Sequence, residues 1–347
     1  MRHAIVAALF SSAIVFAAGR AGTLDIYFID VEGGQATLIV SPAGESMLID
    51  AGYPERHGRD PDRIMAAAFD AHISQLDYLV ITHFHEDHNG GAAEVARRLP
   101  VRTFVDYGEP TQTELDVVAA FATYAEARRQ GAHLMPTPGD RLPMRGLEAT
   151  VVSAGGATLA EPLRGAGDAN PACAPIDPRD WRNNENPRSL GVQLRFGAFT
   201  FLDLGDLMTT KLSDLVCPND LLGRVDVYLV AHHGNNDSNV PALLAALRPR
   251  AAVVNNGAYK GGAGGALDAL HKFPGIEDVW QLHKSGNETV QNSDDALIAN
   301  LEDGEVDLAH WIKLSARDDG TFTIMNGRTG ERREYTRPTG KRLGSTE

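Results

Sequence analysis

The chain has 347 residues, of which 43% are hydrophobic and 22% charged, so it can form one large or two ordinary domains with a substantial buried core. Its formal net charge is −14. Such an acidic chain lacks the basic surface that usually binds phosphate backbones, so the charge disfavours a nuclease that acts on a polymer. Metal-dependent cutting of nucleic acid is still compatible with this charge.

The first residues have the pattern of a secretory signal peptide. A short basic start, Met1–His3, precedes an apolar run, Ala4–Ala18, and small residues follow. The run is too short for a comfortable membrane span, so we expect a signal peptide at residues 1–21 and a periplasmic or secreted protein. The alternatives are an uncleaved anchor or a buried first strand. Loss of Arg2 and Arg20 with the leader would take the formal charge from −14 to −16.

Residues 22–347 are predicted to form one layered α/β domain, because strand-like and helix-like stretches alternate along them without a linker or a tandem repeat. Three early strands separated by turns favour an antiparallel start. Asp60-Pro61 predicts a helix start. Thr113–Arg129 has helical spacing, with Leu115, Val118, Phe121 and Ala125 on one face. The predicted strands are 24–28, 36–40, 46–50, 76–82, 101–107, 147–152, 190–196, 198–204, 225–230, 251–254 and 279–282, and the other predicted helices are 92–98, 209–215, 240–247 and 267–272.

Two segments stand apart from this alternation. Residues 154–188 are rich in Gly, Pro, Asn and Asp and predict a long irregular loop, which we expect to shape a substrate pocket. Residues 311–335 predict a terminal hairpin that either completes a sheet or forms an interface. The two cysteines, Cys173 and Cys217, lack metal-ligand spacing. In an exported chain they form either one disulfide or two independent thiols.

The strongest chemical signal is a cluster of three histidines and an aspartate between a predicted strand and a predicted helix. His83 and His85 are two positions apart in an extended stretch, so both side chains can face one metal ion. Asp87 and His88 lie where the helix begins and can serve a second metal. Imidazole and carboxylate ligands suit zinc, and they also accept manganese or iron. The alternative is a surface or core histidine cluster, which this spacing at a strand end disfavours.

His83-x-His85-x-Asp87-His88 resembles the signature of the metallo-β-lactamase superfamily. The resemblance implies a four-layer αββα sandwich, two divalent metal ions and further ligands downstream. Asp206, which follows Gly205, matches the family's bridging aspartate better than Asp203 does. His233, in His232-His233-Gly234, matches the last ligand, and His232 is either that ligand or a proton donor.

One histidine of the family pattern is missing, because His133, in the interval where it is expected, has the wrong local setting. Asn186 and Ser189 stand near the expected place instead. This resembles the branch that contains the hydrolase domain of bacterial DNA-uptake channel proteins, as does the opening 28–36, although its Gly and Gln are in a different order. The resemblance implies that Asn186 approaches the first metal or binds substrate, and a turn or capping role is the alternative. Asp50 also matches the family and would orient a ligand histidine, or it is a simple turn residue.

The predicted function is hydrolysis of an ester, foremost a phosphoester, by a metal-bound hydroxide. Asp87 and His232 are the candidate groups for proton transfer, and Arg188 and Lys260 are candidate anion binders or solvated surface charges. The alternatives are an amide, lactam or carboxylic ester hydrolase, a redox diiron protein, and a metal- or carbohydrate-binding module without turnover. The sequence predicts a small-molecule or ester substrate, and it does not indicate an oligomeric state.

Overall fold

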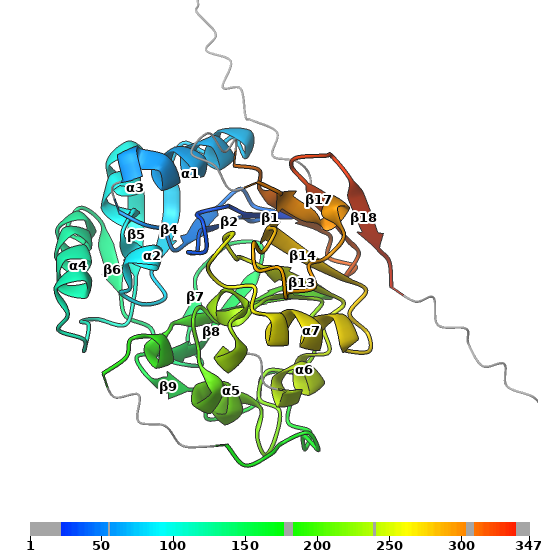
Figure 1. Ribbon diagram of the computed structural model, residues 1–347. Helices are drawn as coiled ribbons and strands as arrows, with labels where there is room; N and C mark the ends of the chain where they lie inside the picture. Colours follow the sequence, from blue (N-terminus) through cyan, green and yellow to red (C-terminus); the bar gives the residue numbers. More distant parts are fainter. Residues whose placement is uncertain (1–21, 55, 177–182, 239–240, 303–308, 338–347) are drawn as a thin grey trace, which may run out of the picture.

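The computed structural model describes residues 22–54, 56–176, 183–238, 241–302 and 309–337 (Figure 1). The predicted leader 1–21 and residues 177–182 of the predicted loop lie outside this description. Within the described residues, no helix combines the length and the apolar character needed to cross a membrane.

Two large β-sheets form the centre of the molecule. The first sheet contains, in spatial order, β18 (Arg332–Tyr335), β17 (Phe322–Asn326), β16 (Ile312–Ala316), β1 (Leu24–Phe28), β2 (Thr37–Val40), β3 (Ser46–Ile49), β4 (Leu76–Val80), β5 (Val101–Val105) and β6 (Ala132–Leu134). The predicted antiparallel start is confirmed as β1–β2–β3, and β3, β4, β5 and β6 are parallel.

The second sheet contains β15 (Ile298–Asn300), β14 (Asp278–His283), β13 (Ala251–Val254), β12 (Val227–Leu229), β11 (Phe199–Asp203), β10 (Gly191–Phe196), β8 (Glu148–Ala154) and β7 (Arg141–Leu142), and β9 (Ala157–Thr158) pairs with β8. The strands β7, β8, β10 and β11 pair antiparallel, and the pairs from β11 to β15 are parallel. The predicted hairpin that turns at Gly197 is confirmed as β10 and β11.

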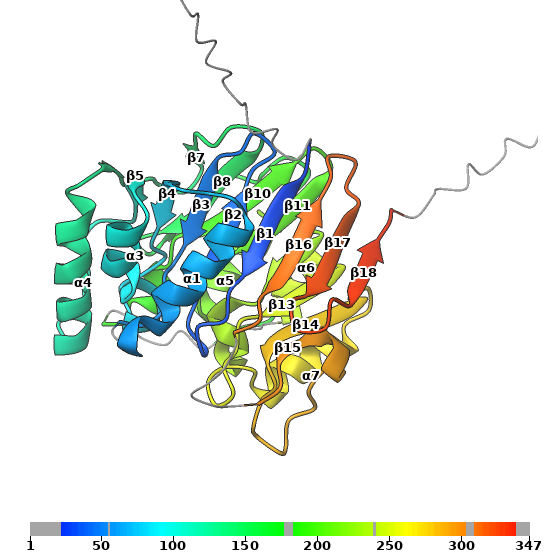
Figure 2. The same ribbon diagram turned by 90° about the horizontal axis from the view of Figure 1, so that it is seen from above.

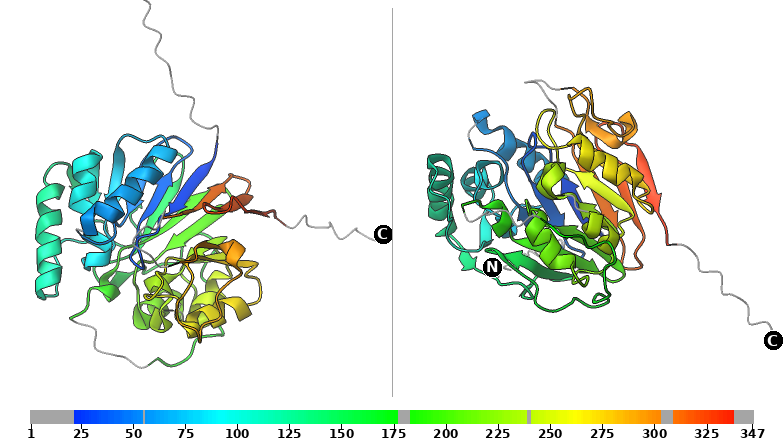
Figure 3. Two further views of the ribbon diagram at one scale, coloured as in Figure 1. Left: turned by 45° about the horizontal axis from the view of Figure 1, so that its top comes forward. Right: turned by 60° about the horizontal axis from the view of Figure 1, so that its bottom comes forward.

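Helices cover the outer face of each sheet, as the views from two directions show (Figures 2 and 3). The first sheet carries α1 (Arg59–Asp70), α2 (Glu86–Asn89), α3 (Ala92–Arg98) and α4 (Leu115–Arg128), and the second carries α5 (Thr209–Val216), α6 (Pro241–Leu247) and α7 (Gly264–Lys272). Short 3-10 turns are η1 (Arg56–Gly58), η2 (Asn186–Arg188), η3 (Ala231–Gly234), η4 (Asn236–Ser238) and η5 (Asp295–Leu297).

Three hydrophobic clusters correspond to the three interfaces between these four layers. Alternation along a strand assigns its side chains to the two faces of the sheet. In β11, Phe199 and Phe201 point into the cluster between the sheets, whereas Leu202 points toward the helices. Phe201 meets Phe28 of the first sheet with ring centroids 5.9 Å apart. The αββα arrangement predicted from the sequence is therefore confirmed.

Helix α4 corrects one expectation. Leu115 and Val118, predicted to lie on the packed face, are 87% and 44% exposed, and the buried side chains are Val117, Tyr124 and Ala127. Apolar residues surround much of this helix, so their spacing alone could not select the packed face. The hydroxyl of Tyr124 donates to buried Asp106 at 2.7 Å, which turns that side inward.

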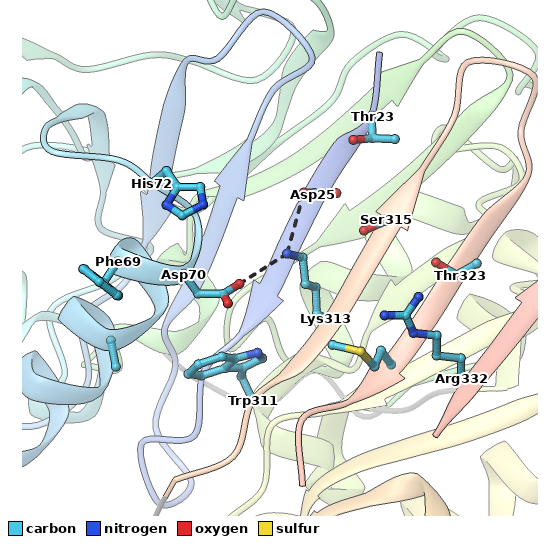
Figure 4. Close-up of a pocket in the computed structure, with 12 residues that line it drawn as sticks. Thr23, Asp25, Phe69, Asp70, His72, Trp311, Lys313, Ser315, Thr323 and Arg332 are labelled. Atoms are coloured by element: carbon cyan, nitrogen blue, oxygen red, sulfur yellow. Dashed lines mark hydrogen bonds and ion pairs between the residues drawn. The ribbon is translucent and has the colours of Figure 1, made fainter. Parts of the chain in front are cut away.

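The terminal segment completes the first sheet, because β16 pairs with β1 and β17 with both β16 and β18. A cavity of about 800 Å³ lies over this part of the sheet, against the end of α1 (Figure 4). Lys313 projects from its floor and forms ion pairs with Asp25 and Asp70. No residue that lines this cavity belongs to the predicted metal cluster.

Candidate metal centre

The predicted ligands meet at one edge, where parallel strands of both sheets end. His83 follows β4, Asp206 follows β11 and His233 follows β12. The loops after the carboxyl ends of parallel strands are the usual place for ligand sites in open α/β sheets. Because the sheets pack face to face, loops more than a hundred residues apart in the sequence come together there.

Four of the predicted ligands form a tight buried cluster. The carboxylates of Asp87 and Asp206 and the rings of His88 and His233 offer ligand atoms that all lie within 4.8 Å of one another. Nε2 of His88 lies 3.3 Å from Oδ2 of Asp87 and 3.3 Å from Oδ2 of Asp206. Nε2 of His233 lies 3.2 Å and 3.3 Å from the same two oxygens. The cluster contains Asp87 and His88, the pair predicted to serve a second metal.

The other two predicted ligands lie beside this cluster. Nε2 of His83 is 3.0 Å from Nδ1 of His85 and 3.9 Å from Oδ2 of Asp206. The strand-end spacing therefore brings the two rings together, and Asp206 of the four-residue cluster also faces His83.

These contacts fit cations better than hydrogen bonds. Nε2 of His88 and Nε2 of His233 are only 3.3 Å apart, and two ring nitrogens can form one hydrogen bond at most. Oδ1 of Asp206 is buried without a hydrogen-bond partner among the described residues. Nitrogen and oxygen lone pairs that converge in this way suit divalent metals such as zinc.

Asp50, which the sequence offered as a partner of a ligand histidine, contacts the ring of His88. It is fully buried after β3, and its Oδ2 accepts from Nδ1 of His88 at 2.7 Å and from the hydroxyl of Thr82 at 2.7 Å. Its Oδ1 accepts from the backbone N–H of Thr82 at 2.8 Å. A donor role for Nδ1 leaves the lone pair of Nε2 directed toward the cluster.

His85 has a corresponding partner that the sequence did not reveal. Oε1 of Gln112 accepts from Nε2 of His85 at 2.7 Å and from the backbone N–H of Glu185 at 2.9 Å. Glu185 is buried and accepts in return from the backbone N–H groups of Thr111 and Gln112. Because Gln112 lies in a loop without a motif, only the folded contact identifies it.

His232 and His233 face the same carboxylate from adjacent positions in η3. Both adopt positive φ, at 52° and 54°, which is uncommon for residues other than glycine. Nε2 of His232 lies 3.7 Å from Oδ2 of Asp206. Its Nδ1 lies 3.0 Å from Oδ1 of Asp237, which fixes the ring. No sequence motif marks Asp237 for this role.

Asn186 and Ser189 both lie at the centre, in the loop before β10. Nδ2 of Asn186 is 3.2 Å from Nε2 of His232, and its Oδ1 is buried without a hydrogen-bond partner among the described residues. Oγ of Ser189 accepts from the backbone N–H of Asp206 at 3.1 Å and lies 3.5 Å from Nδ1 of His83. Ser189 therefore supports two candidate ligands, and Asn186 contacts His232.

Two other candidates lie outside the ligand set. Asp203 accepts from Nε2 of Gln35 and from the backbone N–H of Gly205, both at 2.9 Å, so it supports the loop that presents Asp206. Burial raises the pKa of Asp203 to about 7. His133 lies 2.9 Å from Asp106 and not in the cluster.

The buried charges set the protonation of the metal-free cluster. Burial alone would raise the pKa of Asp87, but His88, His233 and Lys260 hold it well below its ordinary value. Burial opposes the charged form of His88, but Asp206, Asp87 and Asp50 raise its pKa well above normal. The surrounding carboxylates therefore favour the protonated form of His88 in the metal-free chain, and metal binding must displace that proton.

Comparison with known proteins supports the family resemblance. Residues 29–171 match the family model of the metallo-beta-lactamase superfamily. A curated relative, a hydroxyacylglutathione hydrolase from Anaeromyxobacter dehalogenans (strain 2CP-C), is 30% identical over 103 residues, which are 30% of this chain and 37% of the relative. The match thus spans little more than a third of the relative's length.

Solved structures with a similar arrangement are distant in sequence. The metallo-beta-lactamase fold protein YhfI from Bacillus subtilis has a TM-score of 0.46 and 13% identity, over 75% of this chain and 96% of that one. CmlA, a diiron beta-hydroxylase from Streptomyces venezuelae, has a TM-score of 0.36 and 15% identity, over 67% of this chain and 44% of that one. The similarity to the metallo-beta-lactamase superfamily thus rests on the match of residues 29–171.

Proposed function

We propose that this chain with a metallo-β-lactamase superfamily domain is an exported hydrolase that uses two divalent cations, foremost zinc, to cleave a phosphoester. The observation that carries the proposal is the buried convergence of Asp87, His88, Asp206 and His233 within 4.8 Å, with His83 and His85 beside it. His83, His85 and Asp206 would hold the first cation, and Asp87, His88, Asp206 and His233 the second. When bound, such a pair of ions activates water and neutralises the charge that develops on the substrate.

The remaining residues of the site orient the ligands and handle protons. Asp50 holds His88, and Gln112 holds His85, so that one lone pair of each ring faces the centre. Burial alone would lower the pKa of His232, but Asp206 and Asp237 raise it. The side chain of His232 is partly exposed, so its Nε2 can carry a proton to a leaving group. The same atom would instead bind the first cation if His232 takes the place of the missing histidine.

A phosphoester is favoured by the resemblance of 28–36, Asn186 and Ser189 to the DNA-uptake branch, and the acidic chain favours a small substrate over a polymer. Export is supported by the disulfide between Cys173 and Cys217, because disulfides persist in oxidising compartments. A carboxylic or thiol ester is the second candidate, because the curated relative is a hydroxyacylglutathione hydrolase.

A substrate panel tests the proposal. The zinc- and manganese-loaded chain would be assayed with bis(p-nitrophenyl) phosphate, p-nitrophenyl phosphate, p-nitrophenyl acetate and a chromogenic lactam. We expect the phosphoesters to be hydrolysed with the highest kcat/KM. Preference for the acetate would indicate a carboxylic ester hydrolase, and preference for the lactam would indicate a lactam hydrolase. No turnover of any substrate with two metal ions bound would indicate a binding module.

A further inference from the structure

The amino group of Lys260 lies at the metal centre although this residue belongs to none of the metal-binding motifs. Lys260 follows β13, and its Nζ donates to Oδ2 of Asp87 and, at 2.9 Å, to the hydroxyl of Tyr53. The ammonium also lies 5.1 Å from the centroid of the Tyr53 ring. The side chain of Lys260 is 39% exposed, so a ligand can reach it from solvent.

Close backbone packing holds Lys260 in this place. A Cβ on Gly261 would lie 2.3 Å from the backbone oxygen of His233, and a Cβ on Gly33 would lie 2.8 Å from Cβ of Lys260. Both glycines have positive φ. The loop therefore lies directly against the segment that presents His233, and Lys260 is built into the wall of the site.

In the filled site Lys260 would share its counter-ion, Asp87, with the second cation. Two divalent cations bring four positive charges, and Asp50, Asp87 and Asp206 bring three negative ones. Glu32, which is close in the sequence to Gly33, pairs with Arg63 and His283 instead. With Lys260 and an attacking hydroxide included, about one positive charge remains, which a substrate with one negative charge would neutralise.

We propose that Lys260 and the hydroxyl of Tyr53 form an anion-binding subsite beside the second cation, which takes the charged non-bridging oxygen of a phosphodiester. This inference rests on the proposed function, and it narrows the substrate from phosphoesters in general to phosphodiesters with a single negative charge. Lys260 supplies the charge and Tyr53 a directed hydrogen bond, and both are absent from the predicted ligand set.

Binding of an unreactive probe tests the subsite separately from turnover. Diethyl phosphate would be titrated calorimetrically into the metal-loaded wild type and the variants Lys260→Gln, Lys260→Arg and Tyr53→Phe. We expect Lys260→Gln to weaken binding at least tenfold, Tyr53→Phe to weaken it severalfold, and Lys260→Arg to retain most of it. Lys272→Gln is the matched control, because Lys272 is 74% exposed and pairs with Asp268. Its affinity should equal that of the wild type.

Metal content and kinetics supply the outcomes that would overturn the inference. Unchanged affinity of Lys260→Gln for diethyl phosphate would refute the subsite. A lower metal content in Lys260→Gln than in the wild type would show that Lys260 serves only to position the ligand Asp87. A higher metal content would show that the ammonium of Lys260 occupies the position of a cation. Binding that depends on Lys260 without hydrolysis of any phosphodiester would refute the proposed function alone. Hydrolysis of bis(p-nitrophenyl) phosphate that is equal in wild type and Lys260→Gln would refute the subsite alone.

Discussion

Replacing Asp50 with asparagine should weaken one of the two metal-binding steps. Asp50 is fully buried, and its Oδ2 accepts two hydrogen bonds of 2.7 Å, from Nδ1 of His88 and the hydroxyl of Thr82. With the amide nitrogen of asparagine in the place of Oδ2, this nitrogen would face both donors, Nδ1 of His88 and the hydroxyl of Thr82. His88 would then keep its proton on Nε2 and lose the lone pair that faces the cluster.

The expected magnitude follows from the loss of one charge-assisted hydrogen bond to a ligand histidine. Such bonds contribute about 1.5–3 kcal/mol, and loss of the partner of a ligand histidine typically costs about 10–100-fold in metal affinity. Asp50 has no hydrogen bond to His85, so the other binding step should change by less than about threefold on the same scale.

A chelator-competition titration with zinc or cobalt resolves the two steps. Asp106→Asn is the matched control, because Asp106 is equally buried after β5 but binds Tyr124 and Arg128 instead of a ligand. We expect it to lower stability and leave both metal affinities intact. Equal affinities in Asp50→Asn and wild type, or an equal loss at both steps, would refute the assigned role of Asp50.

Three further predictions concern the support of the site and the fold. Gln112→Leu removes the hydrogen-bond acceptor for His85. It should weaken metal binding about tenfold at the step that Asp50→Asn leaves unchanged, as measured in the same titration. An unchanged affinity at that step would contradict the role of Gln112. The pKa of Asp203 near 7 in the folded chain means that the metal-free wild type loses stability as the pH rises from about 5 to 8. The difference in unfolding free energy between Asp203→Asn and wild type should therefore shift by about 2–3 kcal/mol in favour of the variant over this range, as measured by urea unfolding in the presence of a chelator. A difference that stays constant with pH would refute the raised pKa. Replacing Cys173 and Cys217 with serine opens a loop with a sequence separation of 44 and should cost roughly 4 kcal/mol of unfolding free energy on the chain-entropy scale, and an unchanged urea midpoint under non-reducing conditions would contradict this.

The sequence predicted the layers and the ligands because both follow local rules. The alternation of strand-like and helix-like stretches along residues 22–347 predicted a layered α/β domain, and the spacing of His83 and His85 at a strand end predicted that both rings face the same side. Gly205-Asp206 and His233-Gly234 could be assigned from the family resemblance alone. The structure brings four of the predicted ligands, Asp87, His88, Asp206 and His233, within reach of one ion, and His83 and His85 lie beside them.

The residues that orient the ligands could not be predicted, because their roles depend on contacts between distant loops. Gln112 and Glu185 are 73 positions apart, and each is anchored by the backbone of the other's loop. Asp237 has no motif that marks it as the partner of His232. The packed face of α4 was predicted wrongly for a similar reason, because the contact between Tyr124 and Asp106 orients that helix.

The central claim is that the cluster around Asp206 binds two metal ions, and metal content tests it most directly. The purified chain would be loaded with excess zinc, desalted and analysed by elemental mass spectrometry beside Asp206→Ala, with hydrolysis of bis(p-nitrophenyl) phosphate measured on the same samples. The account predicts about two ions per wild-type chain, and loss of both metal and activity in the variant, because Asp206 lies between both ligand groups. A wild-type chain that retains no metal, or an Asp206→Ala variant that retains two ions, would contradict it.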